Sequence, residues 1–383
     1  MRIKSIILVI LALSVILVTF PQIEVKAEST TIVVPDDFSK IQKAIDFASN
    51  GDTIFVKSGI YYEKLIVDKS LNLIGENWTT TIIDANKTGT PISITQNNVA
   101  VTGFTICNGS GYDGGVDFWS RIDYCNITKN RIINNPIGIE ASSTSHSIFN
   151  QNYFLGNTVS IELDGGSKGS YLNNISGNEI LKGNTGISIM YSHNNSISQN
   201  KIEGCKERGI FLLYSNHNSF FTNTVMNSKD VAIALLHSSL NVFSKNDFIR
   251  NTKISDGGWL MPPYNVSSIN IWDIDGQGNY WSDYNGTDSD YDGIGDKPHL
   301  IDDNNQDNYP FIEPILYNPP PKDELEHDFV AEFSSQVIGF FTSKIGLILI
   351  GLAVVAFVII ITLFIVAIKK SKQKEELISD FLK

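Results

Sequence analysis

The chain has little cysteine, little histidine and little positive charge. Three cysteines in 383 residues exclude a disulfide-rich scaffold, although a Cys107–Cys125 bridge stays open. The 29 lysines and arginines stand against 41 acidic residues, which gives a formal net charge of −12. This acidic balance argues against nucleic acid and anionic lipid head groups as partners, and it suits bound cations.

Long apolar runs lie at the two ends. Arg2 and Lys4 precede an apolar stretch and a small-x-small site that ends at Ala27, so residues 1–27 are predicted to be an export signal. Residues 345–368 carry no charge and are long enough to cross a bilayer as one helix. Lysines follow at once, so the positive-inside rule predicts a cytoplasmic tail and an extracellular part before the helix.

A pattern of the form apolar-x-x-Asn-x-apolar recurs through the middle of the chain. Its asparagines follow one another at steps of 22, 26, 22, 23 and 23 residues. They are Asn130, Asn152, Asn178, Asn200, Asn223 and Asn246. A second slot keeps nearly the same step and begins at Gly115, Gly138, Ser160, Gly186, Gly209 and Ala232. Two slots that stay in step over six periods indicate a structural repeat.

The repeat unit is short and strand-like. Apolar, often β-branched residues alternate with others at period two, while Gly, Asn and Ser fill the connections and leave no room for long helices. One coil cannot bury its own apolar face, so coils must stack with each strand about 4.8 Å from its copy. We therefore predict an all-β fold, a right-handed parallel β-helix, in which the recurring asparagines form an internal ladder at the bends.

A short amphipathic helix is expected at the N-terminal end of the stack. Ser39 and Gln42 fit a capping box, and Asn50-Gly51 would end the helix. The apolar stripe between them comprises Ile41, Ala44, Ile45 and Ala48. Such a helix would cover the open end of the core.

Several segments resemble known β-helices. The segments 39–45, 51–56, 59–63 and 71–75 resemble the N-terminal cap and first coils of pectin-lyase-like β-helices. The Gly-Ile…Asn…Ile coils resemble the NosD-like family of periplasmic copper-binding β-helices, also called carbohydrate-binding and sugar-hydrolase repeats. Segments 278–285 and 302–310 are similar to the ends of NosD-like domains in archaeal surface proteins. The resemblance covers about residues 31–316 and implies the fold, with copper as the metal that the family name suggests.

These observations divide the chain into seven predicted segments. They are the signal peptide (1–27), an N-terminal cap with the first coils (28–75), the β-helix repeats (76–285), an Asp-rich cap with a calcium loop (286–316), a Pro-rich juxtamembrane linker (317–344), the transmembrane helix (345–368) and the tail (369–383). Eight Asn-x-Ser/Thr sequons fit an exported glycoprotein.

An Asp-rich loop is the most motif-like cation site. Asp288, Asp290, Asp292 and Asp296 occupy positions 1, 3, 5 and 9 of a loop with Gly293 at position 6, where a sharp turn is needed. The loop departs from an EF-hand because position 12 is a histidine, and it resembles the Asp-rich loops of thrombospondin type 3 repeats. We predict that it binds Ca²⁺; the alternative is a solvated acidic loop.

Alignment of the second slot predicts an outward-facing column of carboxylates. Asp117, Glu140 and Glu162 would lie on consecutive strands, with Asp164 beside Glu162. Stacked carboxylates raise at least one pKa or recruit a cation, and acid–base hydrolases and polysaccharide lyases use both effects. The alternative is an ordinary polar outer face. We find no well-placed Lys or Arg base on the same coils, so enzymatic activity stays uncertain and a non-catalytic role is favoured.

Two further sets of side chains recur in register. Tyr191, Tyr214 and His237 fall on three consecutive coils, where they would bind a glycan or only stabilise the stack. Trp119 and Trp259 could extend this surface. His146, His193 and His217 occupy similar bends and form a weaker candidate site for copper or zinc, polar turn residues being the alternative.

The sequence favours a membrane-anchored surface module that binds a polysaccharide or a surface glycoprotein and carries calcium. A polysaccharide hydrolase or lyase that uses Asp117, Glu140 and Glu162 is the first alternative. A copper-binding maturation factor is the second.

Overall fold

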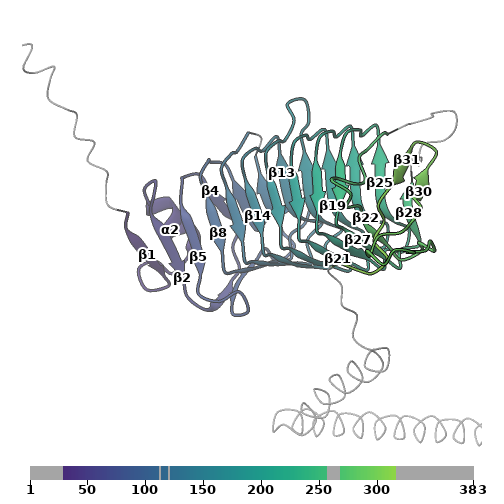
Figure 1. The fold of residues 1–383 in the computed structure, drawn as a ribbon. Helices are drawn as coiled ribbons and strands as arrows, with labels where there is room; N and C mark the ends of the chain where they lie inside the picture. Colours follow the sequence, from purple (N-terminus) through teal and green to yellow (C-terminus); the bar gives the residue numbers. More distant parts are fainter. Residues whose placement is uncertain (1–28, 112–113, 120, 257–267, 316–383) are drawn as a thin grey trace, which may run out of the picture. The chain divides into compact units, whose positions relative to one another are not determined.

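The computed structural model describes residues 29–111, 114–119, 121–256 and 268–315. Within these ranges three parallel sheets surround one core, and each turn of the chain adds one strand to each sheet (Figure 1). The strand order in all three sheets follows the chain, which is the arrangement of a parallel β-helix. The predicted all-β, right-handed parallel solenoid is thus confirmed.

The strands of the three sheets are short, because a bend follows every three to six residues. The first sheet comprises β1 (Thr31–Val34), β2 (Thr53–Val56), β5 (Asn72–Gly75), β8 (Ala100–Thr102), β11 (Asn126–Thr128), β14 (Ile148–Asn150), β17 (Asn174–Ser176), β20 (Ser196–Ser198), β23 (Ser219–Phe221) and β26 (Val242–Ser244). The second comprises β3 (Gly59–Tyr61), β6 (Thr81–Asp84), β9 (Thr105–Cys107), β12 (Arg131–Ile133), β15 (Tyr153–Leu155), β18 (Glu179–Leu181), β21 (Lys201–Glu203), β24 (Thr224–Met226), β27 (Asp247–Ile249) and β29 (Tyr280–Trp281).

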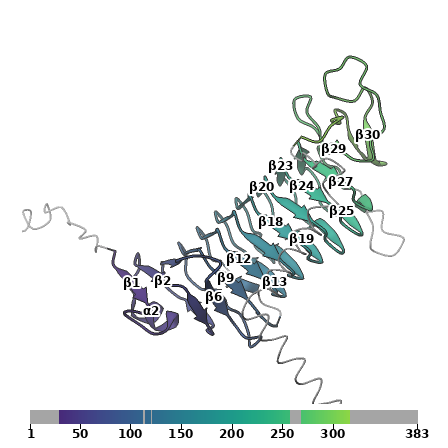
Figure 2. The same cartoon turned by 90° about the horizontal axis from the view of Figure 1, so that it is seen from below.

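The third sheet comprises β4 (Leu65–Val67), β7 (Ile92–Ile94), β10 (Gly114–Phe118), β13 (Ile137–Ser142), β16 (Val159–Asp164), β19 (Thr185–Met190), β22 (Arg208–Leu213), β25 (Val231–Leu236) and β28 (Lys253–Asp256). Figure 2 shows strands of the second sheet, from β6 through β9 and β12 to β18, one behind the other along the stack. An antiparallel pair, β30 (His299–Asp302) and β31 (Asn305–Asp307), follows the last coil.

Each coil sends apolar side chains from all three strands into the core. Ile127 of β11, Ile132 of β12 and Ile139 of β13 are fully buried, and each contributes about 2 kcal/mol by removal from water. In later coils the interior becomes aromatic. Phe243 stacks between Phe220 and Trp272, with ring centroids 4.5 Å apart on both sides. Stacking of equivalent side chains therefore holds successive coils in register.

The predicted asparagine ladder lies at the bend between the first and second sheets and is confirmed. Asn152 donates from Nδ2 to Oδ1 of Asn178 at 3.1 Å and to the carbonyl oxygen of Ile127 at 2.8 Å. Its backbone N–H donates to the same Oδ1 at 2.9 Å. The pattern repeats along the ladder to Asn246, then to Asn279 and Asp307. Each buried amide thus satisfies polar groups of the neighbouring coils.

A second ladder at the bend between the third and first sheets escaped the sequence analysis. It comprises Asn173, Asn195, Asn218, Asn241, Asn270 and Asn305. The Nδ2 atom of Asn195, for example, donates to Oδ1 of Asn218 at 3.0 Å. The signal was present, because asparagine precedes the first-sheet strand at steps of 22, 23 and 23 residues in four consecutive coils.

Helix α2 (Ile41–Phe47) lies near the N-terminal end, and its start differs from the prediction. The N-cap residue is Lys40, so Ser39 lies one position too early and makes no capping bond. The carboxylate of Glu63 on the next coil accepts instead the backbone N–H of Ile41 at 3.0 Å and that of Gln42 at 3.1 Å. The predicted capping box is therefore wrong. The buried face of the helix packs against β1, β2 and β4.

The cysteines are buried free thiols, so the Cys107–Cys125 bridge left open by the sequence is not formed. Burial raises the pKa of Cys107 and that of Cys125 to about 11 and the pKa of Cys205 to about 12. They therefore act as small apolar core residues.

The signal peptide, the linker at 317–344, the membrane span at 345–368, the tail and Trp259 lie outside the described residues. In the ranges that the structure does describe, no helix is both long and apolar enough to cross a membrane.

Candidate functional site

Carboxylates line the outer face of the third sheet in its early coils. Asp117 of β10 is in register with Glu140 of β13, and Glu140 is in register with Glu162 of β16. Period-two alternation turns these side chains outward, because their neighbours Ile139 and Ile161 point into the core. The structure places the three carboxylates in one column, as the sequence alignment predicts.

Glu162 has a raised pKa. Burial raises its pKa, the charge of Asp164 raises it further, and a hydrogen bond with Ser188 lowers it. Asp164 lies two residues further along β16, and its Oδ1 accepts the backbone N–H of Gly166 at 2.9 Å. Glu162 is the last carboxylate of this column, because the next two residues in register are Ser188 and Phe211.

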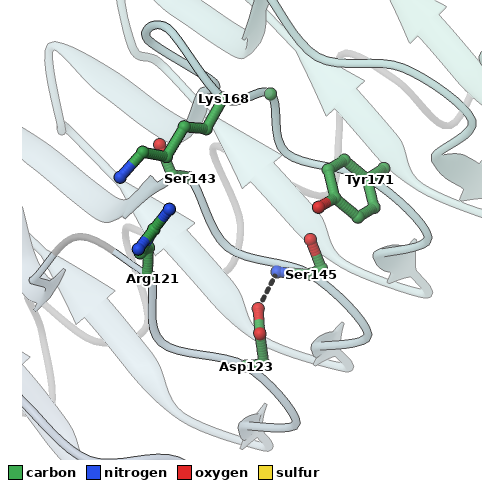
Figure 3. Close-up of a pocket in the computed structure, with 7 residues that line it drawn as sticks. Arg121, Asp123, Ser143, Ser145, Lys168 and Tyr171 are labelled. Carbon is green, nitrogen blue, oxygen red and sulfur yellow. Dashed lines mark hydrogen bonds between the residues drawn. The ribbon is translucent and has the colours of Figure 1, made fainter.

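A pocket of about 340 Å³ lies beside this acidic face, at the bend between the third and first sheets. Its lining comprises Arg121, Asp123, Ser143, Ser145, Lys168, Gly169 and Tyr171 (Figure 3). Residues 165–169 form a loop in the coil that separates Asn152 from Asn178 by 26 residues. The extra residues therefore build one wall of the pocket.

The pocket has two chemically different sides. In Figure 3 the end groups of Arg121 and Lys168 lie on one side, while the Tyr171 hydroxyl points towards Ser145 on the other. Asp123 Oδ1 accepts the backbone N–H of Ser145 at 2.7 Å. Neither Arg121 nor Lys168 forms an ion pair with any carboxylate in the described part of the chain.

These two cations were not predicted from the sequence to line a site. The sequence offers no lysine or arginine well placed as a catalytic base on the carboxylate coils, and the structure places Arg121 and Lys168 in the lining of a pocket at the bends of these coils. Arg121 follows Asp117 on its coil, and Lys168 follows Glu162 and Asp164. The repeat predicts the positions of strand residues only, whereas both cations belong to bends. The 26-residue step between Asn152 and Asn178 was the available sign of extra residues at the bend that carries Lys168.

The predicted aromatic column forms, but its rings cover one another. The ring centroids of Tyr191 and Tyr214 are 5.3 Å apart with 13° between the planes, and those of Tyr214 and His237 are 4.5 Å apart at 3°. Both faces of Tyr214 are therefore covered by neighbouring rings. Trp119, which directly follows β10, is 60% exposed, and no ring of the described residues stacks on it.

The three histidines are not brought together. His146 stacks on Tyr124 with ring centroids 4.9 Å apart, and its backbone N–H donates to Tyr171 one coil later. His193 pairs in register with Tyr171, and its Nδ1 accepts the backbone N–H of Asn216 at 3.0 Å. His217 lies in the column of Asn194, next to that of His193. Among the described residues, no group of three potential metal ligands includes a histidine.

Three of the four predicted calcium ligands converge. Asp288, Asp290 and Asp292 place carboxylate oxygens within 4.8 Å of one another. Asp288 also accepts the backbone N–H groups of Asp292 at 3.2 Å and Gly293 at 3.0 Å, which curls the loop round its first residue. Gly293 has a φ of +86°, a conformation that glycine adopts without strain. Asp296 instead accepts hydrogen bonds from Thr287 and Ser289.

The same loop is bound to the segment that follows β31. The backbone N–H of Gly295 donates to the carbonyl of Pro310 at 2.8 Å, and that of Ile312 donates to the carbonyl of Gly293 at 3.1 Å. The conformation of the Asp-rich loop is therefore coupled to the end of the last hairpin. Carboxylate oxygens are ligands that suit a hard cation such as Ca²⁺.

Comparison with known proteins gives one family match and one curated relative. Residues 169–286 match the family model described as periplasmic copper-binding protein (NosD). A cell surface glycoprotein of Methanothermus fervidus is 34% identical over 127 residues, which are 33% of this chain and 21% of that protein. The matched segment thus spans about a fifth of the relative's length.

The solved structures found by comparison of folds have low sequence identity to this chain. ORF18 of Geobacillus virus E2 has a TM-score of 0.42 at 15% identity, over 62% of this chain and 58% of that chain. The PL6 family alginate lyase AlyGC has a TM-score of 0.43 at 15% identity, over 66% of this chain and 38% of that chain. The strand topology, the two ladders and the family match lead to one conclusion: the chain contains a NosD-like parallel β-helix.

Proposed function

We propose that the protein is a cell-surface β-helix that binds a polysaccharide or the glycan of a surface glycoprotein. The similarity to a cell surface glycoprotein and the predicted export signal support a place outside the cell. The predicted membrane helix at 345–368 would anchor the protein and leave the β-helix exposed.

The observation that carries this proposal is the exposed indole of Trp119 beside the carboxylate column and the polar pocket. An indole ring offers an apolar face on which the C–H groups of a sugar pack. Hydroxyl groups of the same sugar would donate to carboxylates such as Glu140 and Glu162, and charge-assisted bonds of this kind are the stronger ones. A face with both features fits a polar, ring-shaped ligand better than an apolar one.

Binding of the full chain to an array of polysaccharides and glycoprotein glycans tests the proposal. We expect Trp119→Ala to weaken binding by about 10-fold or more, because an aromatic contact and its buried area are lost. Tyr62→Ala is the matched control, since Tyr62 is another highly exposed aromatic, at the end of β3. Absence of binding by the wild-type chain, or equal binding by both variants, would refute glycan binding at this face.

Calcium belongs to the proposal as a structural ion. Asp288, Asp290 and Asp292 would hold it, and the ion would neutralise carboxylates that otherwise repel one another. Because the loop is hydrogen-bonded to residues 310 and 312, the bound ion would stabilise the C-terminal hairpin.

A polysaccharide hydrolase is a second candidate, favoured by the raised pKa of Glu162. A carboxyl that stays protonated at higher pH can act as a general acid, and Glu140 lies in register with it on the neighbouring strand. Turnover of the polysaccharides that the protein binds distinguishes the candidates. Cleavage by the wild type that is lost in Glu140→Gln and Glu162→Gln would replace the binding role with an enzymatic one.

A further inference from the structure

We propose that the pocket beside the carboxylate column binds the negatively charged group of an acidic sugar between Arg121 and Lys168. This inference rests on the proposed glycan binding and adds the class of sugar. The pocket provides the selective contact, whereas Trp119 and the carboxylates provide contacts that any sugar could use.

The lining of the pocket carries a net positive charge. Its lining carries two positive groups, Arg121 and Lys168, and one negative group, Asp123. This local excess of positive charge is unusual on a chain with a net charge of −12. Two cations on the same side of a cavity repel each other, and an anion between them relieves that repulsion. A guanidinium also matches the planar fork of a carboxylate.

The opposite side of the pocket carries hydrogen-bonding groups. Asp123, Ser145 and the Tyr171 hydroxyl face the cavity from there (Figure 3). Asp123 and Ser145 keep each other in place through their 2.7 Å hydrogen bond. These groups suit sugar hydroxyls rather than a simple inorganic anion. A cavity of about 340 Å³ is at the lower end of the range for ligand pockets, which fits a single sugar residue.

The neighbouring carboxylates Glu162 and Asp164 repel an anion that approaches the pocket. Burial raises the pKa of Glu162, and Asp164 is hydrogen-bonded to the backbone N–H of Gly166. Their repulsion acts across solvent, where salt screens it within about 8 Å. Direct contact with Arg121 and Lys168 acts at hydrogen-bond distance, and we infer that it dominates.

The test uses matched pairs of oligosaccharides on a glycan array: each polyuronate beside its neutral methyl ester. We expect the full chain to prefer the free acids by about 10-fold or more, which is the effect of one charge-assisted hydrogen bond. Arg121→Gln and Lys168→Gln should each abolish most of this preference and keep binding to the esters. Lys229→Gln is the control, because Lys229 is an exposed lysine on a later coil.

The outcomes separate the two proposals. A preference for free acids that disappears in both pocket variants supports the anionic-sugar pocket. Binding of acids and esters with equal affinity overturns the inference and leaves glycan binding intact. Lack of binding to any oligosaccharide overturns both. Circular dichroism of the variants shows whether they fold, and both are expected to do so since neither side chain supports another described residue.

Discussion

Asp307 ends the first asparagine ladder by accepting at Oδ2 both the backbone N–H of Asn279, at 2.7 Å, and its side-chain N–H, at 3.2 Å. The indole N–H of Trp281 donates to the same oxygen at 2.8 Å. Each ladder amide donates a side-chain N–H to the oxygen of the next ladder residue, so the last member must accept this bond, and no further ladder residue follows it. A carboxylate meets this need, and β31 supplies it from beyond the repeat. The second ladder ends on the same strand at Asn305.

Asp307 should make stability depend on pH. Burial raises its pKa to about 6, against the lowering effect of the hydrogen bonds from Trp281 and Asn279. A carboxyl with a folded-state pKa above its unfolded value contributes stability below pH 4, and this contribution is lost as the pH rises through about 6. The difference corresponds to about 3 kcal/mol. We therefore expect the free energy of unfolding, relative to Asp307→Asn, to fall by up to that amount between pH 4 and pH 8.

Urea unfolding of both proteins at several pH values measures this difference, and the other titrating groups cancel in the comparison. A constant difference across the range would contradict the raised pKa. A difference that grows with pH would mean that the donors from Asn279, Trp281 and Tyr309 outweigh the cost of burial.

The sequence predicted the repeated parts of the molecule and missed the parts that occur once. The step of the repeat was sufficient to place Asp117, Glu140 and Glu162 in one column, because strand register follows from stacking of equivalent positions. Asp307 could not be recognised as a ladder residue, since it belongs to a hairpin outside the repeat. Arg121 lies at a bend with a φ of +72°, and no periodicity sets the direction of such a side chain.

The interior of the first ladder should be sensitive to loss of one amide. Asn200 accepts two hydrogen bonds from Asn178, at 3.0 Å and 2.9 Å, and donates to the carbonyl of Ile175 and to Asn223, both at 2.9 Å. Asn200→Ala leaves these buried partners unsatisfied. We expect the free energy of unfolding to decrease by about 3 kcal/mol or more, as measured by urea unfolding.

Asn174 provides the matched control for this variant. It lies on β17 of the coil before Asn200, but its side chain points outward and is exposed. Asn174→Ala should change the free energy of unfolding by no more than about 0.5 kcal/mol. Equal effects of the two substitutions would show that the amide ladder adds nothing beyond the packing of the coil.

Removal of calcium should loosen the C-terminal hairpin before the coils. Ligand binding to the folded state alone stabilises by about 2.7 kcal/mol when free Ca²⁺ is about 100-fold above the dissociation constant. EDTA should therefore lower the melting temperature by a few degrees, and added Ca²⁺ should restore it. Hydrogen exchange of the amides at 305–307 should accelerate in EDTA, because the loop is bonded to the chain just after this strand.

The variant Asp290→Asn isolates the loop as the origin of this effect. It removes one of the three converging carboxylates and should abolish the response to EDTA. Asp303→Asn is the control, since Asp303 is an exposed acid at the turn between β30 and β31 and is outside the converging group. A response to EDTA that persists in Asp290→Asn would place the ion elsewhere. A wild-type melting temperature unaffected by EDTA would mean that the three carboxylates form a solvated acidic loop, held in shape by the bonds from Asp288 to Asp292 and Gly293.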